Sequence, residues 1–414
     1  MKRATIFVSL LLAAALACNP RSAQRLVQAS DWEVLPALEQ GHRCAESSNY
    51  IPDSTHLDFW PIKYVQLVNH VVDRSKTPIS FDSVAGPWQI QTIVNIANEW
   101  LERSPRPSLP VGARPPRAHN RLRFRTATNY PNGGTLFHYE EAPEWHVHTG
   151  KGHNRGSRDV YDRYGVDKDS VLNVFYLAHH PDSIASATYK KGVAGVALGG
   201  QWIKMVEEWG NFTTPWPHHS NLIHEIGHVY GLGHAWVRRD GCDDTPQHPN
   251  CWNVSDEPGC EVISNNVMDY TALAITFTPC QVGRMQQRMS VLDGRQRKFL
   301  EPNWCQGNPG VKAELRDTFT LEHATDLESD LILYPGAYLR VRCRLSIPEG
   351  KNILVHPGAT LDLAGGKLHN SCGLNWGGIH VLGRGNKRGR ILWRAGSSVE
   401  NCEALELPPQ ESPG

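Results

Sequence analysis

The chain has 414 residues, and its 42 lysines and arginines balance its 42 aspartates and glutamates. This neutrality argues against a nucleic-acid partner and against a polybasic membrane-binding patch. The length allows two domains with separate cores, and the ten cysteines are typical of a protein from an oxidising compartment.

The N-terminus predicts export. A basic start, Met1-Lys2-Arg3, precedes an apolar run over residues 6–17 that is too short to span a bilayer and is typical of a signal peptide. Small residues before Cys18 resemble a bacterial lipoprotein cleavage site, so we expect a lipoprotein-type signal peptide at residues 1–18 and a lipid anchor at Cys18. Simple secretion after cleavage nearby is the alternative. Either way we expect an extracytoplasmic protein, a cell-surface lipoprotein or a secreted one, with no membrane contact beyond that lipid.

The elements expected next describe a mixed domain. Residues 19–58 are polar and irregular, which predicts a short pro-segment. Strands are predicted at 61–72, 122–126, 172–177 and 193–198, and an amphipathic helix at 87–103. Residues 129–170 are rich in Gly, His, Arg and Asp, which predicts a long surface insertion. Two further helices are predicted at about 218–231 and at 280–289, the latter opened by Thr278-Pro279 as a capping residue and a first-turn proline.

The first of these two helices carries the most informative motif, because residues 224–234 read HExxHxxGxxH. A spacing of four places His224 and His228 on one face of the helix, where two imidazoles can share one Zn²⁺. Gly231 lets the helix end, and the turn brings His234 round as a third ligand. Glu225 lies beside the metal as a general base, which predicts metal-assisted hydrolysis. A His-rich helix end without a metal is the alternative.

Three later segments strengthen this interpretation: CDDTP at 242–246, NNVMDY at 265–270 and FTPCQVGRM at 277–285. With the long zinc motif they resemble the pappalysin and cytophagalysin family of zinc endopeptidases, peptidase family M43 of the metzincin clan. The resemblance implies an α+β fold, with a protease domain at 59–308 built from a mixed twisted sheet, an active-site helix and a Met-turn. It implies that Met268 forms an apolar floor under the histidines and that Tyr270 helps to stabilise the tetrahedral intermediate.

The resemblance also implies a function. We expect a secreted or lipid-anchored zinc endopeptidase, monomeric, in which about residues 193–199 form an edge strand that pairs with a protein or peptide substrate. Glu225 takes a proton from the attacking water and returns one to the leaving amine. Relatives that prefer basic residues carry an acid shortly after the Met-turn tyrosine, whereas residues 271–274 hold none, so an apolar pocket is expected. An adhesin-like, surface-binding protein with an inactive zinc domain is the alternative function.

The resemblance suggests two further sites. Cys44 follows Arg43, as in the pro-segment of family proenzymes, where the thiolate occupies the open zinc position. This implies a zymogen with Cys44 as a cysteine switch; a disulfide or a free thiol at Cys44 is the alternative. Asp243 and Asp244 are candidate ligands for structural Ca²⁺, or simply a solvated acidic pair.

Four cysteines cluster around the expected active-site loops and are expected to form disulfides among themselves, in a pairing that the sequence leaves open: Cys242, Cys251, Cys260 and Cys280.

The tail from residue 311 to residue 414 has a different character. Segment 331–341 recurs 22 residues later as 353–363, with a repeated Pro-Gly-Ala corner. A period of this size predicts stacked rungs, so we expect a small all-β, β-helix-like domain of three or four rungs. So short a stack needs caps or docking on the protease domain at its ends. A small β-sandwich is the alternative, and the expected role is structural support or binding.

Overall fold

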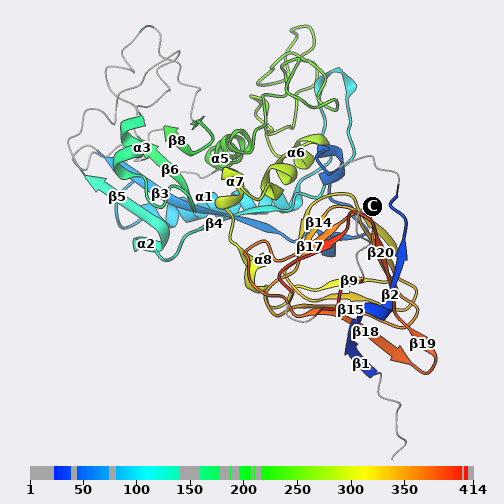
Figure 1. Cartoon of the computed structure of the whole chain (residues 1–414). Coiled ribbons are helices and arrows are strands. Elements are labelled where there is room, and N and C mark those ends of the chain that lie inside the picture. The colour runs from blue at the N-terminus through cyan, green and yellow to red at the C-terminus, as the bar shows by residue number, and fades with distance from the viewer. Residues whose placement is uncertain are drawn as a thin grey trace, which may run out of the picture.

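The computed structural model describes residues 23–38, 44–73, 81–139, 158–177, 187, 195–206, 209, 216–402 and 405–408. Figure 1 shows two parts, a sheet flanked by helices and a stack of short strands built mainly from the C-terminal part of the chain. The expected signal peptide, with Cys18, lies outside the described residues. None of the described helices is long and apolar enough to cross a membrane.

The sheet of the first part is mixed. Its strand order is β4-β3-β6-β8-β7, and β5 pairs with the far end of β3. All neighbours run parallel except β7 and β8, which are antiparallel, so β7 is an antiparallel edge strand. The strands are β3 (Lys63–Asp73), β4 (Leu122–Thr126), β5 (Thr135–Tyr139), β6 (Leu172–Leu177), β7 (Gly195–Leu198) and β8 (Trp202–Val206).

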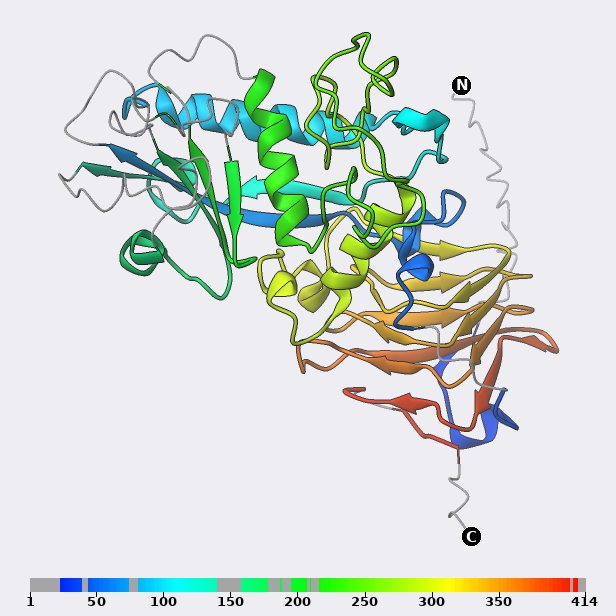
Figure 2. The same ribbon diagram turned by 90° about the horizontal axis from the view of Figure 1, so that it is seen from above.

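Two helix layers cover the sheet. Helices α1 (Gly86–Arg103) and α5 (Trp216–Val229) cross each other on one face and bury their apolar stripes against it (Figure 2). Helix α3 (Arg158–Tyr164) packs on the opposite face with Val160 and Tyr161. All six residues of β6 are buried, because alternate side chains enter one layer or the other. The predicted surface insertion therefore contributes β5 and α3 to the domain.

The remaining short elements link these layers to the second part. Helix α6 (Pro279–Ser290) begins at a capping box, in which Thr278 and Gln281 each accept from the other's backbone N–H. The others are α2 (Pro131–Gly134), α7 (Arg295–Lys298), α8 (Asn303–Gln306), and the 3₁₀ turns η1 (Ala29–Asp31), η2 (Ser47–Tyr50), η3 (Leu57–Phe59) and η4 (Pro110–Gly112).

The second part is a parallel β-helix, in which strands of successive rungs lie one above another (Figure 2). Leu331 pairs with Ile353 and Tyr338 with Thr360, so the 22-residue repeat of the sequence is the rung-to-rung register. The rungs are β9 (Ala313–Leu315), β10 (Thr318–Leu321), β11 (Thr325–Asp326); β12 (Leu331–Leu333), β13 (Tyr338–Val341), β14 (Arg344–Ser346); β15 (Asn352–Val355), β16 (Thr360–Leu363), β17 (Lys367–His369); and β18 (Gly378–Arg384), β20 (Arg390–Arg394), β21 (Ser398–Val399), with β19 (Lys387–Arg388) folding back on β18.

The last rung is covered by the N-terminal segment. Strand β1 (Ala23–Leu26) pairs antiparallel with β18, and β2 (Trp32–Leu35) extends the next sheet beside β20. Trp32 packs edge-on against Trp393, and its indole N–H donates to the backbone carbonyl of Glu406. We expected an irregular pro-segment at residues 19–58. The described part of this segment instead forms two strands, and its role as a pro-segment stays a prediction. The segment supplies the cap that a four-rung stack needs, because a terminal rung otherwise exposes its backbone edge and core.

The rest of that segment joins the two parts. Tyr50, Phe59 and Trp60 are buried in the core of the β-helix, while η2 packs against α6 of the first part. Cys44 forms a disulfide with Cys343. The α+β class with a mixed-sheet domain and a small all-β domain is confirmed, but the all-β domain takes residues from both ends of the chain.

Candidate metal centre

The end of α5 shows why the histidine motif contains a glycine. The N–H of Leu232 donates to the carbonyl of Gly227, and the N–H of Gly231 donates to that of His228. This is the Schellman arrangement, which requires a left-handed residue just after the helix, and Gly231 has φ +87°. The chain then reverses and brings His234 back toward the last helical turn.

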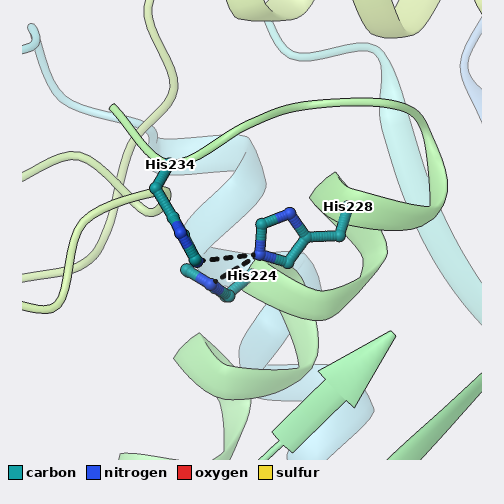
Figure 3. A group of neighbouring side chains, drawn as sticks. All are labelled: His224, His228 and His234. Carbon is teal, nitrogen blue, oxygen red and sulfur yellow. Dashed lines mark hydrogen bonds between the residues drawn. The ribbon is translucent and has the colours of Figure 1, made fainter. Parts of the chain in front are cut away.

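His224, His228 and His234 converge as a result (Figure 3). The Nε2 atom of His228 is 3.1 Å from that of His224 and 3.1 Å from that of His234. Their ligand atoms lie within 4.8 Å of one another. Two nitrogens bound to one tetrahedral zinc at the usual bond length lie about 3.3 Å apart, so the spacing of these three nitrogens fits a single ion.

The protonation of these rings also suits a metal. The Nδ1 atom of His224 is 2.6 Å from the carbonyl oxygen of Val267, and that of His228 is 2.8 Å from the carbonyl oxygen of Leu232. Each Nδ1–H therefore donates to a carbonyl, which leaves the Nε2 lone pair free for a ligand bond. Burial lowers the pKa of His224 to about 3 and that of His234 to about 4, and it also lowers the pKa of His228. All three imidazoles are neutral at physiological pH.

Met268 lies directly beneath this helix. A side chain at Gly227 would have its Cβ 2.5 Å from the sulfur of Met268, so only glycine allows the Met-turn to approach α5 this closely. Asn266 holds the turn: its side-chain oxygen accepts from the N–H of Met268, and its amide exchanges hydrogen bonds with Gln281 of α6. The turn is thus anchored on one side by helix packing and on the other by a buried amide pair.

Glu225 is buried next to the edge strand. Its carboxylate accepts a hydrogen bond from the backbone N–H of Ala197, and a Cβ on Gly195 would lie 2.9 Å from its Oε1 atom. Burial raises the pKa of Glu225 to about 8, against the opposing effect of that hydrogen bond. A carboxyl group with a pKa near neutrality is suited to take up and release a proton.

Tyr270 and Trp236 form the aromatic side of the site. Tyr270 is partly exposed, with 45% of its surface accessible, and its ring lies 5.6 Å from that of His224 and 5.1 Å from that of His234. The ring of Trp236 contacts both side chains, 4.1 Å from the ring of His234 and 4.6 Å from that of Tyr270. The phenol of Tyr270 is therefore placed at the rim of the histidine cluster.

The loop that precedes the Met-turn is braced twice. Disulfides join Cys242 to Cys280 and Cys251 to Cys260, so the predicted pairing within this set of four is confirmed. Two side chains of the loop hold the turn: the Asn250 amide oxygen accepts from the N–H of Tyr270 at 3.1 Å. Buried His248 forms an ion pair with Asp269, with 3.3 Å between Nε2 and Oδ2.

The candidate calcium ligands have a different surrounding. Asp244 accepts from the Thr278 hydroxyl and from the N–H of Cys280, so it caps the start of α6, while Asp243 is exposed. Among the His, Cys, Asp and Glu side chains of the described residues, those that cluster with Asp244 are Cys242 and Cys280, and their sulfurs form a disulfide. In this structure Asp244 therefore serves as a cap of helix α6, and a calcium role for Asp243 and Asp244 stays a prediction.

The cysteine-switch interpretation of Cys44 is wrong for this structure. Cys44 is bonded to Cys343 of the β-helix, with a Cα–Cα distance of 5.8 Å. A sulfur in a disulfide is not a thiolate, so Cys44 cannot act as a zinc ligand in this state. The second reading of the sequence, a disulfide at Cys44, is the one that holds.

Substitution of Cys44 by Ser separates the two roles. We expect C44S to leave kcat/KM unchanged and to lower Tm, because the lost bridge spans 299 residues and a loop this long gives stabilisation of up to about 6 kcal/mol in the chain-entropy model. C343S is the matched control and should lose the same stability, with no further loss in the double variant. A rise in the activity of C44S alone, at unchanged Tm, would instead support the cysteine-switch interpretation.

Several residues of the site escaped sequence reasoning. Gly227 and Trp236 occupy unspecified positions within or beside the motif. Asn250 acts through its side-chain oxygen and Ala197 through its backbone N–H, each on a residue of a distant segment. The strand β8 also went unpredicted, because its run Trp202–Val206 is buried on both faces and shows no alternation. The glycine inside HEIGH was the one readable signal, since glycine in a helix interior is costly and implies a packing reason.

Comparison with known proteins gives one family. The family model of M43 peptidases, described as pregnancy-associated plasma protein-A, matches residues 153–290. No curated protein matches the chain. Mature mirolysin of Tannerella forsythia, in complex with a cleaved peptide, is 20% identical to this chain, with a TM-score of 0.39. The match covers 60% of this chain and 96% of the mirolysin chain. Mirolysin in complex with compound 9 is 18% identical, with a TM-score of 0.39 over 58% and 96%.

Proposed function

Because residues 153–290 match the family model of M43 metallopeptidases, we propose that this protein is a zinc endopeptidase that cleaves protein or peptide substrates. The observation that carries the proposal is the convergence of three neutral imidazoles on one point, with a buried carboxylate one residue from the first of them. His224, His228 and His234 would hold the ion. When bound, zinc supplies Lewis-acid chemistry, which acidifies water and polarises a carbonyl group.

The remaining chemistry belongs to side chains of the chain. Glu225 takes a proton from the attacking water and delivers it to the leaving amine, which needs a carboxyl group that titrates near neutrality and is shielded from bulk solvent. Tyr270 is proposed to donate its phenolic O–H to the oxygen that becomes negative in the transition state. Its ring stands at the rim of the histidine cluster, and Asn250 holds its backbone, which supports that role.

We further propose that β7 binds the substrate backbone. β7 lies at the edge of the sheet beside Glu225, and it runs antiparallel to β8. An extended peptide that adds to this edge gains main-chain hydrogen bonds regardless of its sequence, so side-chain pockets must supply any preference. Residues 271–274 contain no acidic group, and Leu273, three residues after Tyr270 in the chain, is half-exposed, which supports a preference for apolar side chains.

The location of the enzyme is a proposal of the same kind. Four disulfides within the described residues suit an oxidising compartment, and the leader sequence supports export, either to a lipid anchor at Cys18 or to the medium. The β-helix favours the alternative, an adhesin-like role for the whole chain. The presence of Glu225 argues against it, because an inactive zinc domain would not need this carboxyl group.

The experiment is a digest of a peptide library with and without a strong chelator. We expect cleavage that the chelator removes and that added Zn²⁺ restores, with apolar residues enriched on one side of the cut. Cleavage that persists after metal removal would exclude a metallopeptidase. Cleavage mainly before Arg or Lys would refute the apolar pocket while leaving the zinc mechanism intact.

A further inference from the structure

The three histidines of the site are not held in the same way. His224 and His228 are each fixed by an Nδ1–H bond to a backbone carbonyl, at 2.6 Å and 2.8 Å. His234 has no such bond: the described residues offer its Nδ1 atom no carbonyl or carboxylate acceptor. It also stands outside α5, on the chain that follows Gly231, so helical geometry does not orient it either. Histidine ligands almost always need a partner of this kind to fix the plane of the ring.

An aromatic ring takes that place. Trp236 stacks on His234 with ring centroids 4.1 Å apart and planes 11° from parallel. Between them, Ala235 is buried, and its N–H donates to the carbonyl of Met268, which ties this stretch of chain to the Met-turn. His234 is neutral, so the contact is an aromatic stack rather than a cation–π pair.

The same indole reaches the second functional group. The ring of Trp236 lies 4.6 Å from that of Tyr270 with the planes inclined by 53°, so the indole contacts both a metal-ligand candidate and the phenol at the rim. Trp236 is itself half-buried, and its ring contacts both of the other rings.

We propose that Trp236 is a positioning residue for the metal centre, which fixes the ring plane of His234 by stacking and sets Tyr270 against it. The proposal rests on the proposed function for the identity of the metal. It assigns to stacking, for one ligand, the role that backbone carbonyls play for the other two. Loss of an orienting partner of a histidine ligand typically costs about 10–100-fold in metal affinity or activity.

The test measures zinc affinity directly, by competition with a chromophoric chelator, on the full chain. We expect W236A to bind zinc at least about 10-fold more weakly than the wild type and W236F to remain close to it, since phenylalanine keeps a stacking ring. W252A is the matched control: Trp252 lies on the disulfide-braced loop and is 61% exposed, and it should bind zinc like the wild type.

Two further readouts separate positioning from folding. Thermal unfolding of metal-free W236A should remain a single cooperative transition, which shows that any loss of zinc affinity occurs in a folded protein. In a kinetic assay W236A should lose kcat more than it raises KM, since the substrate strand at β7 is untouched.

The outcomes are distinguishable from those of the proposed function. W236A with wild-type zinc affinity, or W236F as weak as W236A, contradicts the role of Trp236 and leaves the endopeptidase standing. A wild-type protein that binds zinc through His234 but cleaves nothing contradicts the endopeptidase, while the affinity series still decides the role of Trp236.

Discussion

Substitution of Glu225 by Gln is expected to lower kcat/KM by about 10²–10⁴-fold while zinc remains bound. The amide has the same shape and can still accept the backbone N–H of Ala197, but it cannot take a proton from water. The three imidazoles do not depend on the carboxylate for their orientation, because His224 and His228 are fixed by the carbonyls of Val267 and Leu232. The effect should therefore appear in turnover and not in metal content.

The same variant tests the electrostatics of the site. In the metal-free protein, burial raises the pKa of Glu225 from 4.5 to about 8. The folded state then binds a proton that the unfolded state has lost between these two values, so stability falls as the pH rises from 4.5 to 8. Metal-free E225Q should exceed the wild type in Tm at pH 7 and equal it at pH 4.

Metal content, peptide cleavage and thermal unfolding check this prediction together. Glu257 is exposed on the loop before the Met-turn, so E257Q is the control and should behave as the wild type. Retained activity in E225Q would remove Glu225 from the mechanism. Lost activity with lost zinc would show instead that the carboxylate supports the ion.

The second large effect is expected at the junction of the two domains. Asp326 of β11 is buried between two guanidinium groups: its carboxylate lies 2.6 Å from Nη1 of Arg297 and 2.7 Å from Nη1 of Arg344. Lys63 of β3 adds a third buried cation, 3.6 Å from Glu328. The first domain contributes Arg297 and Lys63, and the β-helix contributes the rest, so the cluster holds the domains together.

Replacing Asp326 by Ala is expected to cost about 3–5 kcal/mol of unfolding free energy. The substitution leaves Arg297 and Arg344 buried and without their shared anion, and Lys63 loses a neighbouring charge. Burial by itself would raise the pKa of Asp326, but Arg344 and Arg297 hold it well below its usual value. The stabilisation is therefore complete above about pH 4 and is lost as the pH falls below it.

Denaturant unfolding at pH 7 measures this cost. Glu349 is an exposed carboxylate of the same domain, so E349A should change the unfolding free energy by no more than about 0.5 kcal/mol. A loss in D326A as small as that would mean that the buried cations find other partners and that the cluster does not secure the junction.

Much of the first domain was predictable because its signals are local. Strands at 122–126 and 172–177 were predicted at the residues where they occur, and α1 and α6 within one or two residues. The Met-turn and the helix cap at Thr278 carry their own short patterns. The 22-residue repeat of the sequence equals the rung-to-rung register of the β-helix. Periodicity and capping act within a few residues of one another, so a single sequence displays them.

Two errors have one cause. The polar stretch at 19–58 looked irregular because its strands β1 and β2 pair only with the last rung, more than 350 residues away in the chain. Cys44 resembled a switch because Arg43 precedes it, whereas its partner Cys343 lies in a different domain. In both cases, the residues around the segment give no indication of its distant partner in the fold.

The sequence by itself determined the chemistry of the site: a helical spacing of four, a glycine that ends the helix and a third histidine beyond it place three imidazoles together by local geometry alone. Only the tertiary structure decided what holds those groups in place, namely the stack of Trp236 on His234, the approach of Met268 to Gly227, and the Asp326 cluster between the domains. These contacts depend on packing between distant segments, where shape and burial select the partner, and no spacing rule encodes that choice.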